Sequence, residues 1–319
     1  MSPARCRARG WRFAILALLL VACQSAPPTP TPTLTPTATE RPTATPSPTL
    51  TASPSPTATP GFDHPSHVFV VILENTPVEQ AIGPKAPYLA ELAHRYGLAT
   101  DYFGVAHPSQ PNYLELFSGS TQGVTDDKKH DITAPNLADQ LEAAGLTWRL
   151  YAENYPGNCD TEGSASGGAD GPGEYARKHN PAISFTSIAH VPARCANITD
   201  FSHLDPNASD VAFIVPNLCH DMHDCPTATG DAWARDVLGP IIASPAMEDG
   251  VMFITFDEAE TDANQVATIV VTPRLVEPVS SARRYDHASL LRTIEDLYRL
   301  PCLADACDAE PMTDLIPQS

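Results

Sequence analysis

The chain has 319 residues, of which 42% are hydrophobic, and it carries 19 Lys and Arg against 38 Asp and Glu, a formal net charge of −19. This acidity argues against a nucleic-acid binder, whose affinity depends on basic side chains that displace counterions from phosphates. We also expect no membrane-spanning segment, because the main apolar run, residues 13–22, is shorter than the roughly 18 residues that a bilayer requires.

The first 23 residues have the layout of a targeting segment. Four arginines precede the apolar run, which ends in Leu20-Val21-Ala22-Cys23. Small residues before a Cys resemble the bacterial lipobox, so residues 1–22 are expected to be a lipoprotein signal peptide and Cys23 the lipid anchor. This predicts an extracytoplasmic protein held on a bacterial membrane surface. The alternative is an ordinary secreted protein cleaved near Ala22.

Residues 23–60 are predicted to form a Thr- and Pro-rich disordered tether. Residues 26–60 hold 11 of the 33 prolines and consist almost entirely of Thr, Pro, Ser and Ala. Such a segment cannot bury enough apolar area to fold, and an extended polyproline conformation would reach about 100 Å. Residues 1–60 hold five Arg and one Glu, so residues 61–319 carry 14 basic and 37 acidic side chains, a charge of −23. We expect these 259 residues to form one catalytic domain.

Short β-rich runs alternate with helical patterns along this domain. The predicted strands are 67–73, 98–103, 147–151, 211–215, 251–256 and 267–272, and several are apolar on both faces, as buried parallel strands are. The predicted helices are 87–96, 135–144, 231–242 and a last one that begins after the N-cap Asp286 and ends before Pro301. The alternation predicts an α/β fold with helices on both faces of a mostly parallel sheet.

Polar side chains follow three of these strands. Glu74 and Asn75 follow the first, a His-, Asp- and Cys-rich segment at 219–225 follows the fourth, and Asp257 with Glu258 follows the fifth. Each segment alone could be a solvated loop. The carboxyl ends of parallel strands share one edge, however, where ligands bind. Like charges gathered there would repel one another, and a bound divalent cation would relieve the repulsion.

The segment 106–113, AHPSQPNY, contains a candidate nucleophile. Pro111 suits a first helical position, which places Ser109 at a helix N-terminus. Free N–H groups and the helix dipole at such a position favour a phosphate or a developing oxyanion. A hydroxyl beside an anion site and near a cation can act as a nucleophile. The alternative is that Ser109 is only an N-cap.

Six cysteines lie in the predicted domain and allow 15 pairings. The two short spacings favour Cys219–Cys225 and Cys302–Cys307, which leaves Cys159–Cys195. A zinc cluster of Cys219, His220, His223 and Cys225 is the alternative for the first pair. In an oxidising compartment the disulfide is favoured, and it leaves both histidines for the active site.

Several segments carry a family resemblance. They are LEN at 73–75, HPSQPNYLELFSGSTQG at 107–123, PNLCHDMHDC at 216–225, FITFDE at 253–258 and YDHASLLRTIEDLY at 285–298. In this order they resemble the phosphoesterase family of bacterial secreted acid phosphatases and phospholipases C, within the alkaline phosphatase superfamily. The resemblance covers nearly all of residues 66–300. It implies an alkaline phosphatase-like fold, a three-layer α/β/α sandwich.

The resemblance also implies roles for individual residues. Glu74 and Asn75 match an early metal-binding pair, and Ser109 matches a metal-bound nucleophile. Asp257 and Glu258 match a late acidic pair, whose second member can be Asp in the acid phosphatases, so Glu258 is a conservative departure. The remaining expected site residues are Asn112 as a donor to phosphate oxygens, the imidazoles of His107, His220, His223 and His287, and Asp221 and Asp286 as groups that orient them.

Together these features predict metal-dependent hydrolysis of small phosphate monoesters through a phosphoserine. The identity of the divalent metal ion and the oligomeric state stay open. A phospholipase C, which would cleave diesters at the same site, is the nearest alternative. A substrate-binding lipoprotein without catalysis is a further one, which the presence of Ser109 beside two acidic pairs disfavours.

Overall fold

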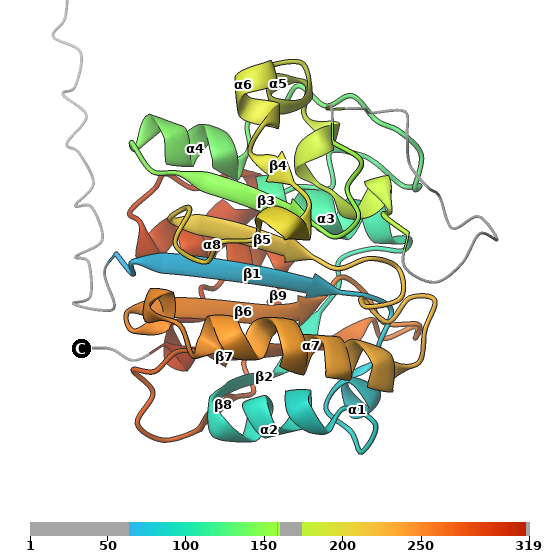
Figure 1. The fold of residues 1–319 in the computed structure, drawn as a ribbon, viewed down its shortest axis with the longest axis vertical. Coiled ribbons are helices and arrows are strands. Elements are labelled where there is room, and N and C mark those ends of the chain that lie inside the picture. The colour runs from blue at the N-terminus through green and yellow to red at the C-terminus, as the bar shows by residue number, and fades with distance from the viewer. Residues whose placement is uncertain (1–63, 158, 160–173, 317–319) are drawn as a thin grey trace, which may run out of the picture. The chain divides into compact units, whose positions relative to one another are not determined.

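A computed structural model describes residues 64–157, 159 and 174–316 of the chain, and a nine-stranded sheet forms its centre (Figure 1). The order across the sheet is β4, β3, β5, β1, β6, β7, β2 and β8, with β9 also paired to β2. The strands are β1 (His67–Leu73), β2 (Gly97–Phe103), β3 (Trp148–Ala152), β4 (Ile198–Thr199), β5 (Val211–Val215), β6 (Gly250–Phe256), β7 (Gln265–Val271), β8 (Val279–Ser281) and β9 (Tyr285–Asp286).

The sheet is mostly parallel, as predicted. The exception is β7, which runs antiparallel to its neighbours β6 and β2. Only residues 257–264 connect β6 to β7, and this connection is too short for the crossover that a parallel pair requires. The last predicted strand is therefore present, but it runs in the opposite direction.

Helices cover both faces of the sheet (Figure 1). On one face α7 (Thr227–Ile242) packs beside α2 (Pro87–Arg95), and on the other α3 (Ser109–Ser118) packs beside α8 (His287–Leu297). The shorter α-helices are α1 (Val78–Ala81), α4 (Leu137–Ala143), α5 (Thr186–Ala189) and α6 (Pro192–Cys195). The 3-10 helices are η1 (Arg177–His179), η2 (Ala182–Ser184), η3 (Phe201–His203), η4 (Pro245–Met247), η5 (Ala304–Cys307) and η6 (Thr313–Leu315). The predicted three-layer α/β/α sandwich is confirmed.

Local sequence explains where these helices begin. The Asp286 side chain accepts a hydrogen bond from the Ser289 N–H at 3.1 Å and caps α8, as predicted. α7 begins four residues before its predicted start, and its first turn packs against the preceding loop. A side chain at Gly230 would lie 2.5 Å from Met222 Cγ, so only glycine permits this close approach.

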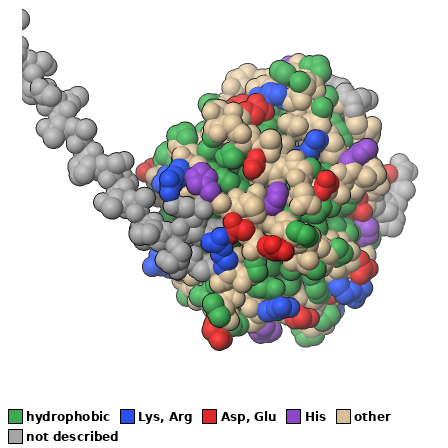
Figure 2. Space-filling model, turned by 60° about the vertical axis from the view of Figure 1, so that its left-hand side comes forward, with side chains coloured by type: hydrophobic (Ala, Val, Ile, Leu, Met, Phe, Trp, Pro, Cys, Tyr) green, Lys and Arg blue, Asp and Glu red, His purple; other side chains and the backbone are tan. Residues whose placement is uncertain are grey.

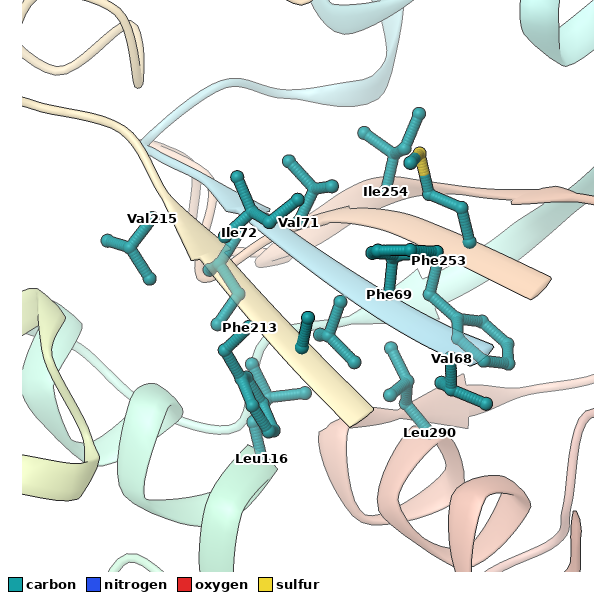
Figure 3. Packing of buried hydrophobic residues seen from close by; sticks show 14 of the residues in the cluster. Val68, Phe69, Val71, Ile72, Leu116, Phe213, Val215, Phe253, Ile254 and Leu290 are labelled. Carbon is teal, nitrogen blue, oxygen red and sulfur yellow. The ribbon is translucent and has the colours of Figure 1, made fainter. Parts of the chain in front are cut away.

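The core surrounds β1, which is apolar on both faces (Figure 3). Val68, Val70, Val71 and Ile72 have no solvent exposure. Their neighbours in Figure 3 include Phe213 and Val215 of β5, Phe253 and Ile254 of β6, Leu116 of α3 and Leu290 of α8. Burial of such side chains contributes roughly 1.5–3 kcal/mol each. The buried sheet therefore provides a rigid support for the loops at its edge.

The three predicted disulfides are confirmed. They join Cys159 to Cys195, Cys219 to Cys225, and Cys302 to Cys307. The Cys219–Cys225 bond consumes the two thiols that a zinc cluster would need. It also closes the loop between β5 and α7, which leads into the edge of the sheet where polar side chains gather.

The predicted signal peptide, the Cys23 anchor and the tether lie outside the described residues. Within the ranges given above, no helix has both the length and the apolar character needed to cross a bilayer.

Candidate active site

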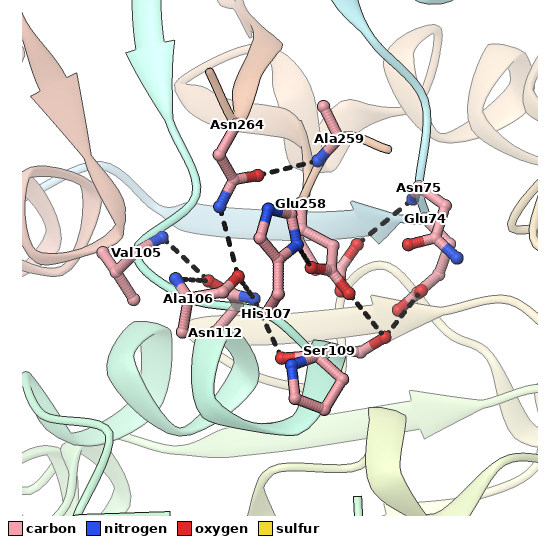
Figure 4. A network of polar contacts seen from close by, with 12 residues as sticks. Glu74, Asn75, Val105, Ala106, His107, Ser109, Asn112, Glu258, Ala259 and Asn264 are labelled. Carbon is pink, nitrogen blue, oxygen red and sulfur yellow. Dashed lines mark hydrogen bonds and ion pairs between the residues drawn. The ribbon is translucent and has the colours of Figure 1, made fainter. Parts of the chain in front are cut away.

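Acidic side chains gather at the carboxyl ends of three neighbouring parallel strands. Glu74 follows β1, Asp221 lies in the loop after β5, and Asp257 follows β6. Because these strands run in the same direction, their carboxyl ends share one edge of the sheet. Figure 4 shows Glu258 and Ser109, the latter at the start of α3, at the same edge. This edge is the candidate active site.

Ser109 lies between two carboxylates. Its Oγ is 3.2 Å from Glu74 Oε2 and 3.2 Å from Glu258 Oε1, and the residue is 1% exposed. A hydroxyl has a single proton and can donate to only one of these oxygens at a time. α3 begins at Ser109 itself, and Pro111 occupies the third helical position instead of the predicted first. The seryl oxygen is thus fixed at a helix N-terminus next to a cluster of carboxyl groups.

The buried carboxylates oppose one another electrostatically. Burial raises the pKa of Glu74 well above its ordinary value, and the Asp221 carboxylate raises it further. Burial also raises the pKa of Asp257, with further contributions from Glu74 and Glu258. These shifts indicate that the folded protein disfavours full ionisation of the cluster, even with the Lys178 ammonium nearby, unless further positive charge joins it.

The donor atoms of this cluster match a hard divalent cation. Carboxylate oxygens dominate the set, and Asp257 Oδ2 is buried without a hydrogen-bond partner. In the described part of the chain, no three His, Cys, Asp or Glu side chains already converge as a metal-binding group. The residues therefore fit such a cation by their chemistry, although they do not form a preassembled ligand cage.

Asn75 adopts the backbone conformation that turns the chain after β1. Its φ of +50° lies in the left-handed region, which Asn tolerates better than most residues. Its backbone N–H donates to Asp257 Oδ1 at 3.3 Å. This contact ties the end of β1 to the end of β6. The predicted metal contact of its side chain stays a prediction.

His107 and Asn112 flank the nucleophile. His107 Nδ1 contacts Glu258 Oε2, and the imidazole side chain is 50% exposed, so it can reach a substrate from the solvent side. The Asn112 side chain instead accepts hydrogen bonds from the N–H groups of Val105 and Ala106 at 2.8 and 3.0 Å and donates to the Ala106 carbonyl (Figure 4). In this structure Asn112 holds the loop before Ser109 in place, and its predicted contact with phosphate oxygens stays a prediction.

His220 and His223 pair with acidic side chains that differ from those around Ser109. His220 Nδ1 is 2.8 Å from Glu153 Oε2, and its ring stacks on Trp233. His223 Nδ1 is 2.6 Å from Asp224 Oδ1. The structure gives neither imidazole a contact with the seryl oxygen, and their predicted roles near the substrate stay predictions.

His287 lies behind Asp257. Its Nε2 is 2.6 Å from the Asp257 carbonyl oxygen, its Nδ1 is 3.0 Å from the Tyr102 hydroxyl, and the residue is fully buried. Burial lowers its pKa to about 4, so it is neutral at physiological pH. His287 therefore supports the backbone of Asp257, and its predicted role near the substrate stays a prediction. Asp286, expected to orient an imidazole, caps α8 with its carboxylate.

The structure adds His179, which the sequence analysis misses. His179 is buried between two carboxylates, with Nε2 3.0 Å from Glu74 Oε1 and Nδ1 3.2 Å from Asp221 Oδ2. The ring stacks on Tyr113 with centroids 5.1 Å apart, and the Tyr113 hydroxyl donates to Glu74 Oε1 at 2.6 Å. Burial lowers the pKa of His179 well below its ordinary value. A neutral imidazole thus separates Glu74 from Asp221.

Lys178 and Asp127 also lie at the candidate active site, although the sequence does not predict them there. Lys178 Nζ is 2.9 Å from Asp127 Oδ2 and 3.4 Å from Ser109 Oγ. Burial pushes the pKa of Lys178 down, but Glu74 and Asp127 outweigh this effect and the pKa is raised. Asp127 Oδ1 accepts the Gln110 N–H at 3.0 Å, so one of the helix N–H groups that we expect to be free is already occupied. The only signal in the sequence is the basic triplet at 177–179 in an acidic chain.

The model of the phosphoesterase family matches residues 82–301 of this chain. The chain belongs to the phosphoesterase family. It is 32% identical to the phosphatidylinositol-3-phosphatase of Mycobacterium tuberculosis over 254 residues, which are 78% of this chain and 82% of that protein. It is also 32% identical to a probable acid phosphatase of Kluyveromyces lactis over 248 residues, which are 74% of this chain and 58% of that protein. These relatives identify this phosphoesterase as a phosphoric ester hydrolase.

The fold has matches among solved structures. A protein in the alkaline phosphatase superfamily from Vibrio parahaemolyticus superposes with a TM-score of 0.50 at 10% identity, and the match covers 78% of this phosphoesterase and 72% of that chain. At this identity the similarity concerns the fold alone. It confirms the expected alkaline phosphatase-like architecture.

Proposed function

We propose that this phosphoesterase hydrolyses small phosphate monoesters in two displacements, with Ser109 as the nucleophile. The observation that carries the proposal is the position of Ser109 Oγ, which lies 3.2 Å from both Glu74 and Glu258 at the N-terminus of α3. The names of the relatives, acid phosphatase and phosphatidylinositol-3-phosphatase, support this substrate class.

A divalent cation belongs to this proposal. The residues that would hold it are Glu74, Asn75, Asp257 and Glu258. When bound, such an ion supplies Lewis-acid stabilisation of the charge on the phosphoryl group. The unpartnered Asp257 Oδ2 and the raised pKa values of Glu74 and Asp257 support this assignment.

In the first displacement, the Ser109 hydroxyl gives its proton to Glu74 or Glu258, and the seryl oxygen attacks phosphorus. The new O–P bond forms while the bond between phosphorus and the leaving alcohol breaks. His107, half exposed and in contact with Glu258, protonates the leaving oxygen. The N-terminus of α3 favours the negative charge that gathers on the phosphoryl oxygens.

In the second displacement, a water molecule gives a proton to His107, which lost one in the first step, and attacks the phosphoserine, whose O–P bond to Ser109 breaks. Inorganic phosphate leaves, and the seryl oxygen regains a proton from a neighbouring carboxyl group. The same residues serve both steps, since the attacking water enters where the alcohol has left. Neutral His179 and the Tyr113 hydroxyl hold Glu74 in place throughout.

Replacement of the nucleophile tests the proposal. Ser109→Ala should lower kcat/KM for p-nitrophenyl phosphate by about a thousandfold or more, because no other group provides the attacking oxygen. Ser118→Ala, at the other end of the same helix, is the matched control and should stay within about threefold of wild type. Activity of Ser109→Ala within a fewfold of wild type would refute the proposed nucleophile.

Removal of metal tests the cation. Dialysis against a chelator should abolish hydrolysis, and one divalent cation in an add-back series should restore it. The same cation should raise the Tm of the chelated protein, and Asp257→Asn should remove this rise. Full activity after chelation would contradict the cation assignment.

We also propose that the enzyme is anchored to the outer face of a bacterial membrane through Cys23. The basic and apolar leader, the small residues before Cys23 and the Pro-rich tether support this location. Labelled palmitate should be incorporated into the wild-type chain in the membrane fraction. Cys23→Ala should lose the label and appear in the soluble fraction, and its retention in the membrane would contradict the anchor.

A further inference from the structure

A lysine reaches the nucleophile from a distant part of the chain. Lys178 of η1 lies 69 residues after Ser109, and its Nζ is 3.4 Å from Ser109 Oγ. Its other partner is Asp127, with Nζ 2.9 Å from Oδ2. The ammonium group therefore contacts the oxygen that bonds to phosphorus in the proposed reaction.

Contacts on both sides hold this lysine in place. The adjacent residue, His179, is buried between Glu74 and Asp221 and stacked on Tyr113. Asp127 is itself fixed to the first turn of α3 by the Gln110 N–H. A charged group that is held before the substrate arrives costs little reorganisation during the reaction.

The ammonium group has donor capacity to spare. It carries three N–H bonds, of which Asp127 takes one and Ser109 a second. The lysine side chain is 21% exposed, whereas Ser109 is 1% exposed, so Lys178 is partly accessible to solvent while the hydroxyl that it contacts is buried. A phosphoryl group on Ser109 would present its oxygens to this ammonium.

Attraction of an anionic substrate has to be local in this protein. Residues 61–319 carry a formal charge of −23, and Lys and Arg side chains lie scattered among acidic ones on the face that Figure 2 shows. The long-range field of such a domain repels phosphate esters. A cation next to the nucleophile offsets this repulsion where the substrate binds.

We infer that Lys178 is a further catalytic residue, whose ammonium group binds the phosphoryl oxygens at Ser109 and makes the site select dianionic phosphate monoesters over diesters. This inference rests on the proposed function. A monoester dianion carries two negative charges on three terminal oxygens, whereas a diester carries one charge on two. A fixed positive charge therefore stabilises the transition state of the monoester more strongly. Asp127 is the positioning residue for this ammonium.

A comparison of two esters with the same leaving group tests the inference. In Lys178→Met, kcat/KM for p-nitrophenyl phosphate should fall about a hundredfold, a loss typical of a removed electrostatic stabiliser, while kcat/KM for methyl p-nitrophenyl phosphate falls less than about fivefold. Lys178→Arg should restore at least a tenth of the wild-type preference. Lys128→Met, which removes an exposed lysine that pairs with Asp126 next to Asp127, is the matched control and should leave both values within about twofold.

Two further measurements keep the test decisive. Inorganic phosphate should raise the Tm of wild-type protein more than that of Lys178→Met. If Lys178→Met does not fold, Asp127→Asn should still lower monoester turnover selectively, by about fivefold, because the amide oxygen can keep the Gln110 hydrogen bond while the charge that holds Lys178 is lost.

The outcomes separate this inference from the proposed function. Wild-type protein that hydrolyses neither ester, or an active Ser109→Ala, would overturn both. A wild type that works through Ser109 but whose Lys178 variants lose both esters equally, or lose neither, would overturn the role of Lys178 alone. Equal loss would mean that Lys178 only neutralises the acidic cluster.

Discussion

The middle of β1 and its carboxyl end are equally buried, but burial has opposite consequences in the two regions. Val70, Val71 and Ile72 have no solvent exposure and stabilise the fold by leaving water. Glu74, two residues after Ile72, also has no exposure, yet burial raises its pKa well above the ordinary value. Burial in the core thus stabilises the fold. Burial of carboxyl groups at the edge of the sheet costs free energy, which a bound cation would offset.

The largest change in activity is expected at the edge of the sheet. Glu74→Gln should lower kcat/KM by about a thousandfold, because it removes a charge beside the nucleophile. The same change should stabilise the metal-free protein at pH 8 by about 1 kcal/mol, since a neutral side chain there avoids the cost of burying a charge. Glu79→Gln, an exposed carboxylate on α1, is the control and should change neither quantity. If metal-free Glu74→Gln were less stable than metal-free wild type, burial of Glu74 would stabilise the fold as the core residues do, and the two regions would not differ.

In the core, Ile72→Ala should have the opposite effect: it should lower stability and leave activity nearly unchanged. The free energy of unfolding should fall by about 3 kcal/mol, through lost burial and the cavity that remains. At a temperature where the variant is folded, kcat/KM should stay within about threefold of wild type. Val276→Ala provides a control because Val276 is 92% exposed, and its stability should change by less than about 0.5 kcal/mol. Urea unfolding measures the stability of both variants. If Ile72→Ala were inactive but as stable as wild type, the core residue would act on catalysis and not on stability, which would contradict this prediction.

A smaller effect concerns a buried carboxylate away from Ser109. Burial raises the pKa of Glu115 on α3 from 4.5 to about 7. The folded protein therefore binds this proton more tightly than the unfolded chain, and the stability from Glu115 is complete below about pH 4.5 and lost as the pH rises to about 7. Glu115→Gln should flatten the stability profile in this window and gain about 1 kcal/mol at pH 8, with kcat/KM unchanged. An unaltered profile would show that the carboxylate is ionised at no cost.

The smallest expected effect is that of salt. Because the domain charge of −23 repels anions, kcat/KM for p-nitrophenyl phosphate should rise by up to about twofold between low and moderate ionic strength. A steep fall would mean that attraction by Lys178 and the cation dominates even at long range. The dependence of kcat/KM on ionic strength thus measures how far the electrostatic field of the site extends beyond the edge of the sheet.

The sequence predicts the core and the acidic edge because both depend on local patterns. Buried parallel strands have continuous apolar runs, and the residues after β1 and β6 must lie together once those strands pair. Lys178 and His179 escape such reasoning, because η1 has no periodic pattern and its contacts reach Ser109 and Glu74 across long stretches of chain. The Asn112 side chain carries both a donor and an acceptor, so its sequence position does not decide whether it binds phosphate or the backbone.

The most direct test of the central claim is a single-turnover acid quench with a labelled phosphate monoester, followed by peptide mapping. If Ser109 is the nucleophile, a covalent phosphate should appear on the peptide that contains Ser109, no later than free phosphate, and should be absent from Ser109→Ala. Turnover without a labelled enzyme, or a label on another residue, would contradict it.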